Sequence, residues 1–172
     1  MATPFHLEIV SPERTVWSGE AEEVSMRTDT GEIAFLAHHE DFVGAADVTV
    51  VRITTAAVEG SEHAGEVRVA VHGGFVHVEH DPSSVRILAG IAELASEIDV
   101  ERARRALEAA ESAAGTERAA QGSSSATPAD GADHARAHAS GALLAMLEPD
   151  APEVAARRAR VRLDAAGVSV AS

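Results

Sequence analysis

The hydrophobic pattern of the chain changes its period near residue 96. Upstream, apolar and polar residues alternate, as in Phe5-His6-Leu7-Glu8-Ile9-Val10, and this period of two is typical of half-buried β-strands. After Ile98 the apolar residues recur every third or fourth position, which is the period of an amphipathic helix. The pattern predicts a β domain over residues 1–90 and a helical arm over residues 91–172.

Turn residues divide the β half into about ten short predicted strands. Pro12 ends the first strand, and Gly73-Gly74 predicts a tight hairpin turn, because glycine accepts the positive φ that such turns need. Many short strands at near-regular spacing favour an antiparallel β-sandwich or flattened barrel.

The helical half predicts two helices joined by a long connection. The first carries a narrow apolar stripe of Ala103, Ala106, Leu107 and Ala110. Alanine buries little area, so this stripe is expected to hold its partner weakly. Small and polar residues dominate positions 114–141, which predicts a flexible linker.

The second helix has clearer boundary signals. Asp150 and Glu153 form a capping-box pattern, Pro152 suits the first turn, and Gly167 is a typical C-terminal stop. One face carries Val154, Val161 and Ala165. The segment Leu143–Leu147 is apolar and is interpreted as a short docking helix. The whole arm is therefore predicted to be a helical hairpin with a lengthened connection.

Composition excludes several kinds of chemistry. The chain has no cysteine, which excludes disulfides and thiolate metal sites. It has no lysine, which excludes Schiff-base catalysis and a phosphate-binding P-loop. Neither an apolar run long enough to span a membrane nor a secretion signal is present in the sequence, so a cytoplasmic location is expected.

The net charge of −14 is unevenly distributed. Residues 1–95 carry a net charge of −11, whereas four arginines lie within residues 157–162. An acidic body repels phosphates and argues against nucleic acid or an anionic membrane as a direct partner. The arginine cluster instead suits an acidic protein partner.

The nine histidines do not form a convincing metal site, and no catalytic constellation is evident. His77 and His80 are three positions apart, so on a regular strand they point to opposite faces. We interpret the histidines as solvent-facing or interface residues and expect neither catalytic nor metal-binding residues.

The junction between the two halves is the segment Ser96–Ala103. Asp99 is a predicted N-cap, and Ile98 and Ala103 occupy the two positions of a hydrophobic staple. Arg102 has no such structural task, since a cation in the first turn opposes the helix dipole. It either forms a salt bridge with Asp99 or Glu93 or binds an external phosphate or carboxylate.

Several short stretches of the β half, together with the junction, form a specific combination. They are Val10-Ser11-Pro12-Glu13, Gly19-Glu20-Ala21, Gly31-Glu32, His72-Gly73-Gly74-Phe75, Ile87-Leu88-Ala89 and Ala92-Glu93-Leu94. Followed by Ser96–Ala103, this combination resembles the epsilon subunit of bacterial F-type ATP synthase. The resemblance covers the first hundred or so residues.

The resemblance implies a non-catalytic rotor subunit of the central stalk. The β domain would contact the gamma subunit and the c-subunit ring, and would couple proton translocation to ATP synthesis. The helical arm would reach the alpha/beta catalytic head and inhibit ATP hydrolysis. The protein would be peripheral, on the cytoplasmic face of the bacterial membrane, and would touch that membrane only through the complex.

The resemblance also implies a regulatory ATP site, although no cofactor would be required. Some members bind ATP through a pattern that matches Ile98, Asp99, Arg102 and Ala103, and Glu93 matches an upstream acid. Arginines of the second helix contribute in those members. The full set of candidates for binding ATP, or Mg-ATP, is Glu93, Ile98, Asp99, Arg102, Ala103, Arg158 and Arg162.

One loop differs from the family pattern. Where the family often has Leu-Pro-Gly-His-Ala-Pro, this chain has Leu36-Ala37-His38-His39-Glu40-Asp41. The resemblance places the gamma or c-ring interface near this loop, so His38, His39, Glu40 and Asp41 are its candidates.

Two alternatives of other classes remain open from the residues. The chain could be a free-standing nucleotide- or ligand-sensing β-sandwich with a helical clamp, or a small histidine-metal enzyme of barrel type. Association with gamma distinguishes the first from the rotor subunit, and metal analysis tests the second.

Overall fold

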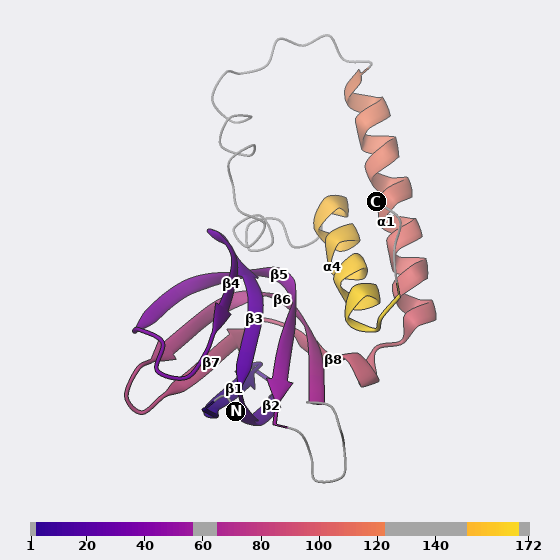
Figure 1. Ribbon diagram of the computed structural model, residues 1–172. Coiled ribbons are helices and arrows are strands. Elements are labelled where there is room, and N and C mark those ends of the chain that lie inside the picture. Colours follow the sequence, from indigo (N-terminus) through magenta and orange to yellow (C-terminus); the bar gives the residue numbers. More distant parts are fainter. Residues whose placement is uncertain (1–2, 57–64, 123–150, 169–172) are drawn as a thin grey trace, which may run out of the picture.

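The computed structural model describes residues 3–56, 65–122 and 151–168 and shows a β-sandwich with a helical hairpin at one side (Figure 1). The strands are β1 (Phe5–Val10), β2 (Thr15–Ala21), β3 (Glu23–Thr28), β4 (Gly31–Phe35), β5 (Phe42–Thr55), β6 (Gly65–Glu79), β7 (Ser84–Ala89) and β8 (Ala92–Leu94). The helices are η1 (Ala95–Glu97), α1 (Val100–Gly122) and α4 (Pro152–Ala165).

The strands form one sheet whose two ends meet around a shared core. The order is β2-β1-β7-β6-β5-β3-β4, and β8 pairs with β6. Side chains from both ends of this path, among them Leu7, Ile9, Phe35 and Ile87, are fully buried in one cluster. The predicted sandwich is confirmed, with two differences. The described residues form eight strands rather than about ten, and β1 pairs with β7 in parallel rather than antiparallel.

The strand count differs mainly because β5 and β6 are long. The predicted hairpin turn at Gly73-Gly74 is wrong, since β6 runs through both glycines and stays paired with β5 on either side. Both glycines have positive φ, 89° and 151°. A Cβ on Gly74 would lie 2.1 Å from the carbonyl oxygen of Leu88 in β7. The glycines therefore permit a distorted strand and a close strand approach.

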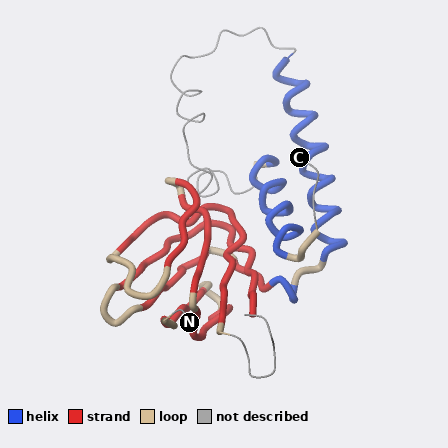
Figure 2. The backbone as a smooth tube through the Cα atoms, viewed as in Figure 1, coloured by secondary structure: helices blue, strands red, loops and turns tan. Residues whose placement is uncertain are grey.

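The helices lie side by side at one end of the sandwich (Figure 2). Their contact is built from small residues, as predicted: Ala103, Leu107 and Ala110 of α1 pack against Leu163 and two alanines of α4. Ala106, which the predicted stripe included, is exposed. No helix in the described part of the chain has the length and apolar character needed to cross a membrane.

The end of α1 corrects the predicted start of the linker. α1 continues to Gly122, so residues 114–122 of the predicted linker are helical, in keeping with the high helix propensity of their alanines. The remainder of that linker and Leu143–Leu147 lie outside the described residues.

Helix α4 begins with Pro152 at its first position, as predicted, but its N-cap is Ala151, without a side-chain cap, rather than Asp150. Its end is confirmed. Gly167 has φ 77°, and the amide of Val168 donates to the carbonyl of Leu163 at 2.8 Å.

Candidate functional site

Helix α4 packs directly on strands β5 and β6 of the sandwich. Val154 and Val161 cluster with Val48 of β5, while Val161 and Ala165 cluster with Val50. These are the three α4 residues that the sequence places on one face. We call this contact the apolar strip. The apolar area that it buries is small, so polar contacts at its edges matter for how firmly α4 is held.

One edge of the strip is an ion pair on a buried acid of β5. The Asp47 side chain is only 6% exposed, and its carboxylate pairs with Arg157 of α4. Its other oxygen accepts a hydrogen bond from the backbone amide of Val48 at 2.8 Å, and Arg27 of β3 lies 3.9 Å away. Asp47 therefore has compensating partners for its burial, and one of them comes from the helical arm.

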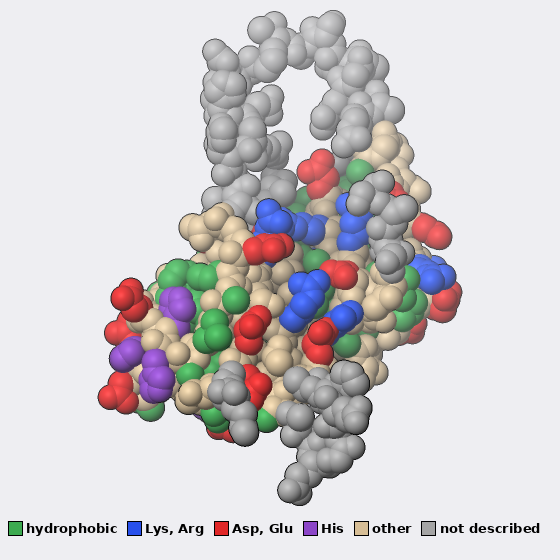
Figure 3. Space-filling view, in the orientation of Figure 1, with side chains coloured by type: hydrophobic (Ala, Val, Ile, Leu, Met, Phe, Trp, Pro, Cys, Tyr) green, Lys and Arg blue, Asp and Glu red, His purple; other side chains and the backbone are tan. Residues whose placement is uncertain are grey.

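The other edge is a cluster around Glu93 of β8. The Nε of Arg162 in α4 donates to Glu93 Oε1 at 2.7 Å, and its Nη2 lies 2.6 Å from the same oxygen. The guanidinium of Arg102 in α1 lies 4.0 Å from the other carboxylate oxygen. Beneath them lies His72 of β6, fully buried, with its Nε2 3.4 Å from Glu93 Oε1. Residues of β6, α1 and α4 thus meet at the Glu93 carboxylate of β8. Charged side chains gather where the helices join the sandwich (Figure 3).

These contacts lower both pKa values, which favours the ionised form of Glu93 and the neutral form of His72. Contact with His72 and hydrogen bonds from Arg162, opposed by burial, lower the pKa of Glu93 to about 2. Burial lowers the pKa of His72, and Arg162 and Arg158 lower it further, while Glu93 opposes them. The 3.4 Å contact lacks hydrogen-bond alignment, since neither ring nitrogen of His72 has a hydrogen-bond partner among the described atoms. Arg162 therefore makes the firmer interaction with Glu93.

The junction itself is held by local polar contacts. Asp99 caps α1 as predicted, because its Oδ1 accepts from the backbone amide of Arg102 at 2.9 Å. Arg14, in the turn after β1, pairs with Glu97 of η1, which ties the start of the arm to the sandwich. Ile98 is buried with residues of the sandwich and α4, so it packs across the junction.

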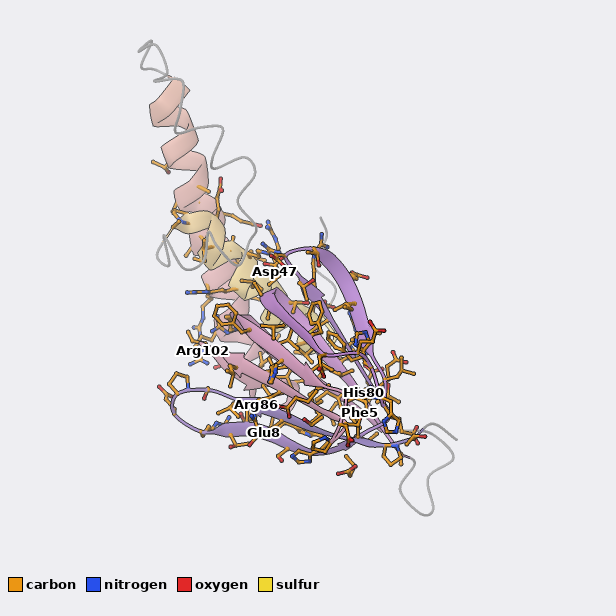
Figure 4. All side chains as sticks on the ribbon, turned by 90° about the vertical axis from the view of Figure 1, so that its left-hand side faces the viewer. Phe5, Glu8, Asp47, His80, Arg86 and Arg102 are labelled. Carbon is orange, nitrogen blue, oxygen red and sulfur yellow. The ribbon has the colours of Figure 1, made fainter. Side chains whose placement is uncertain are left out.

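The predicted interface loop lies at the other end of the sandwich. His38 has φ 59°, and its backbone amide donates to Ser83 at 2.9 Å. His80 joins this loop, since its amide donates to Asp41 at 2.8 Å and its Nδ1 lies 3.0 Å from the carbonyl oxygen of His38. Figure 4 shows His80 at this end and Asp47 and Arg102 toward the helices. Of the remaining candidates, His39 packs its ring against Phe35, and its Nδ1 lies 2.8 Å from the carbonyl oxygen of Glu40.

An exposed apolar group lies on β5, β6 and β7. Phe75 and Leu88 are cross-strand partners and are 50% and 47% exposed, and Val43 is 70% exposed. The sequence analysis missed this group, although strict alternation along β6 places Phe75 opposite to the buried Val76. Exposed apolar residues grouped on a sheet are typical of protein contact surfaces.

Comparison with known proteins agrees with the fold. The sequence model of the ATP synthase delta/epsilon chain β-sandwich domain matches residues 4–95. The ATP synthase epsilon chain of Streptomyces griseus is 48% identical over 112 residues, which are 65% of this chain and 84% of that one. The epsilon chain of Thermobifida fusca is 48% identical over 106 residues, 61% of this chain and 73% of that one. The chain belongs to the ATP synthase epsilon chain family.

A solved structure supports membership of an ATP synthase complex. One chain in the cryo-EM structure of the Euglena gracilis mitochondrial ATP synthase, containing OSCP, F1 and c-ring, superposes with a TM-score of 0.53 and 25% identity. The match covers 65% of this chain and 66% of that chain. As an epsilon chain, the protein is a non-catalytic stalk component. This favours the rotor-subunit interpretation over a ligand-sensing β-sandwich or a histidine-metal enzyme.

The epsilon chain brings together only some of the residues expected to bind ATP. Glu93, Arg102 and Arg162 converge, and Arg158 lies near enough to His72 to influence its pKa. Asp99 is committed to capping, while the side chains of Ile98 and Ala103 are buried in packing. For these last two residues, the arrangement supports the structural role rather than direct contact with a ligand.

A cleft of about 340 Å³ opens beside Arg102, which is 69% exposed. Guanidinium groups suit phosphates, so Arg102 fits an anionic group at this cleft. Glu13 and Glu93 also line it, and Arg162 is engaged by Glu93. A triphosphate would therefore compete with Glu93 for Arg162. No group of three or more acidic or histidine side chains in the described ranges is arranged to hold a metal ion.

Sequence reasoning missed two members of this site. Asp47 is an acidic residue of β5, and its burial is unusual enough to demand a cationic partner. That partner, Arg157, was noted only as part of an arginine-rich helix. His72 was interpreted as a solvent-facing or interface histidine, and its burial corrects the solvent-facing part of that interpretation. Its position near Glu93 and the arginines of α4 had no local signal in the sequence.

Proposed function

We propose that this epsilon chain is the central-stalk rotor subunit that couples proton translocation to ATP synthesis, on the cytoplasmic face of the bacterial membrane. The observation that carries the proposal is the match of the whole sandwich to the delta/epsilon β-sandwich domain. In this function the sandwich binds the gamma subunit and the c-ring, and the histidine end that contains His38 and His80 faces one of them.

The apolar group of Val43, Phe75 and Leu88 supports gamma as a partner. Transfer of such apolar side chains from water into a protein interface is favourable. The test is co-purification of gamma with the full chain carrying Phe75→Asp, with Thr15→Asp on the exposed part of β2 as the matched control. We expect Phe75→Asp to lose gamma and Thr15→Asp to retain it. Equal retention by both variants would remove this surface from the proposal.

The helical arm is proposed to inhibit ATP hydrolysis when it leaves the sandwich and reaches the alpha/beta head. Support comes from how α4 is held: a narrow apolar strip and the ion pairs Asp47–Arg157, Glu93–Arg162 and Arg52–Asp164 form a contact that can be exchanged for another. Removal of residues 112–172 is expected to raise hydrolysis by the assembled enzyme. Unchanged hydrolysis in an assembly that contains the truncated chain would reject the inhibitory role.

Regulatory ATP is proposed to bind at the cleft beside Arg102, with Arg162 as a second cation once it leaves Glu93. The exposed guanidinium of Arg102 is the feature that supports it. Calorimetric titration of the full chain with Mg-ATP is the test, and Arg102→Ala should weaken binding while leaving the fold intact. Absence of binding by the parent chain would reject the site.

A further inference from the structure

His72 is a buried titratable residue without a role in the function proposed so far. Its side chain has no exposed surface, and neither ring nitrogen has a hydrogen-bond partner among the described atoms. Buried polar groups are normally hydrogen-bonded, so an unbonded imidazole at an interface between two parts of a protein requires an explanation. The site is not closed by strands alone, because α4 covers it.

The charges that face His72 come from three packed elements. From β8, Glu93 lies 3.4 Å away. From α4, Arg158 and Arg162 act on the imidazole, and from α1, Arg102 reaches the same Glu93 carboxylate. The cross-strand partner of His72 on β5 is the uncharged Val48. Among the described residues, three arginines thus share the surroundings of His72 with the Glu93 carboxylate.

The other charged residues of β5 and β6 near His72 interact with residues other than His72. Asp47, beside Val48, is paired with Arg157 and lies near Arg27. Arg68, earlier on β6, pairs with Glu66. A proton on His72 would therefore place a further positive charge beside Arg158 and Arg162, at a side chain with no exposed surface.

From this arrangement we propose that His72 is a proton sensor whose protonation releases α4 from the sandwich. With neutral His72, the Glu93 carboxylate is available to Arg162, and the contact holds. A protonated imidazole competes with Arg162 for Glu93 and repels both Arg158 and Arg162. Release of α4 removes these two cations and gives the imidazolium access to water.

The direction of the pH dependence follows from linkage. Burial and the arginines lower the pKa of His72 in the docked state, and release of α4 returns it toward the ordinary value of about 6.5. The released state therefore binds the proton more tightly, and docking weakens as the pH falls below that value. Glu93, with a pKa of about 2, stays ionised throughout this range and is not the group that titrates.

The consequence for the enzyme rests on the proposed inhibitory function of the arm. An acidified compartment would release the arm and reduce ATP hydrolysis by the complex. The docking step can be measured without the complex, so the two proposals can fail separately.

The test follows hydrogen–deuterium exchange of α4 in the full chain between pH 7.5 and 5.5, corrected for intrinsic exchange with peptides from β5. The parent chain should show α4 protection that falls by up to about tenfold per pH unit below pH 6.5. His72→Gln should remove this slope, and His77→Gln, at a half-buried position of β6, should retain it. An equal slope in all three chains, or none in the parent, would overturn the proposal.

A second measurement keeps the test decisive if His72→Gln does not fold. Titration of the parent chain by histidine-selective NMR should give His72 a pKa below the ordinary value. A His72 pKa at or above 6.5 would overturn the proposal. If docking responds to pH as expected while hydrolysis by the complex does not change, the proton sensor stands and the inhibitory function of the arm is rejected.

Discussion

Gly74 is the residue at which β6 meets β7 at a separation that only glycine allows. Its φ is 151°, and a Cβ would lie 2.1 Å from the carbonyl oxygen of Leu88 and 2.9 Å from the Cα of Ala89. Both obstacles are backbone atoms, which cannot move aside without disturbing the pairing of the two strands. The position therefore combines conformational strain with a direct clash.

Substitution Gly74→Ala should accordingly destabilise the sandwich by about 2–4 kcal/mol, from overpacking and backbone strain together. Gly90→Ala is the control, because a Cβ there meets nothing within 4 Å and no positive φ is required. Chemical denaturation of both variants measures the free energy of unfolding. Comparable stability of the two would show that β6 and β7 can separate without cost.

Which single residues could be predicted depended on how local their interactions are. Asp99 was predicted as a cap because its partner is the amide of a residue three positions later. The sequence analysis gave Arg102 two possible roles, a salt bridge or contact with an external anion. Its 4.0 Å distance from Glu93 supports the salt bridge. Asp47 and His72 could not be assigned, because Arg157, which pairs with Asp47, and the arginines that lower the pKa of His72 lie far along the chain on α4.

At the scale of elements, the hairpin depends on a few large side chains. Leu107 and Leu163 are the two leucines in the described contact between α1 and α4, and alanines supply most of the remainder. Alanine contacts permit close approach but bury little area, so each leucine carries a large share of the packing.

Leu163→Ala should therefore cost about 2–5 kcal/mol of packing energy and detach α4 from α1 and from the sandwich. Leu163 is 1% exposed, whereas Leu88 of β7 is 47% exposed, so Leu88→Ala is the matched control. Hydrogen exchange should increase along α4 in the first variant and remain unchanged in the second. Protection of α4 that survives Leu163→Ala would place its stability in the apolar strip on β5 and in the ion pairs.

Element types followed from the sequence more reliably than element limits. Alternation and the later helical period predicted the strands and both helices, because each period reports directly which side is buried. Gly73-Gly74 was misread because glycines mark distorted strands as well as turns. The extension of α1 to Gly122 was missed because its small residues resemble a linker in composition, yet alanine is also the strongest helix former.

For the whole molecule, charge connects the two halves. Residues 1–95 carry a net charge of −11, and four of the nine arginines beyond them lie within residues 157–162. The structure joins these opposite charges at two places on the sandwich, Asp47 and Glu93, which receive Arg157 and Arg162 of α4. The arm is thus held to an acidic body by arginines five positions apart on one helix.

This arrangement predicts that loss of one acid on the sandwich loosens the arm more than loss of an acid within the hairpin. Glu93→Gln leaves Arg162, which is only 25% exposed, without its ion-pair partner in the described structure, and should weaken docking by about 1–3 kcal/mol. Glu111→Gln breaks a pair with Arg160 whose members are about half exposed, and such pairs contribute about 0–1 kcal/mol.

Hydrogen exchange of α4 at pH 7.5 in the two variants measures this difference, and exchange of β5 shows whether the sandwich stays folded. Added salt should loosen α4 further in the parent chain, because it screens the remaining attraction between the arm and the acidic body. The same salt should have less effect on Glu93→Gln, which has already lost one of the ion pairs between the arm and the sandwich. Equal loosening by Glu93→Gln and Glu111→Gln would mean that apolar packing, rather than charge, sets the position of the arm.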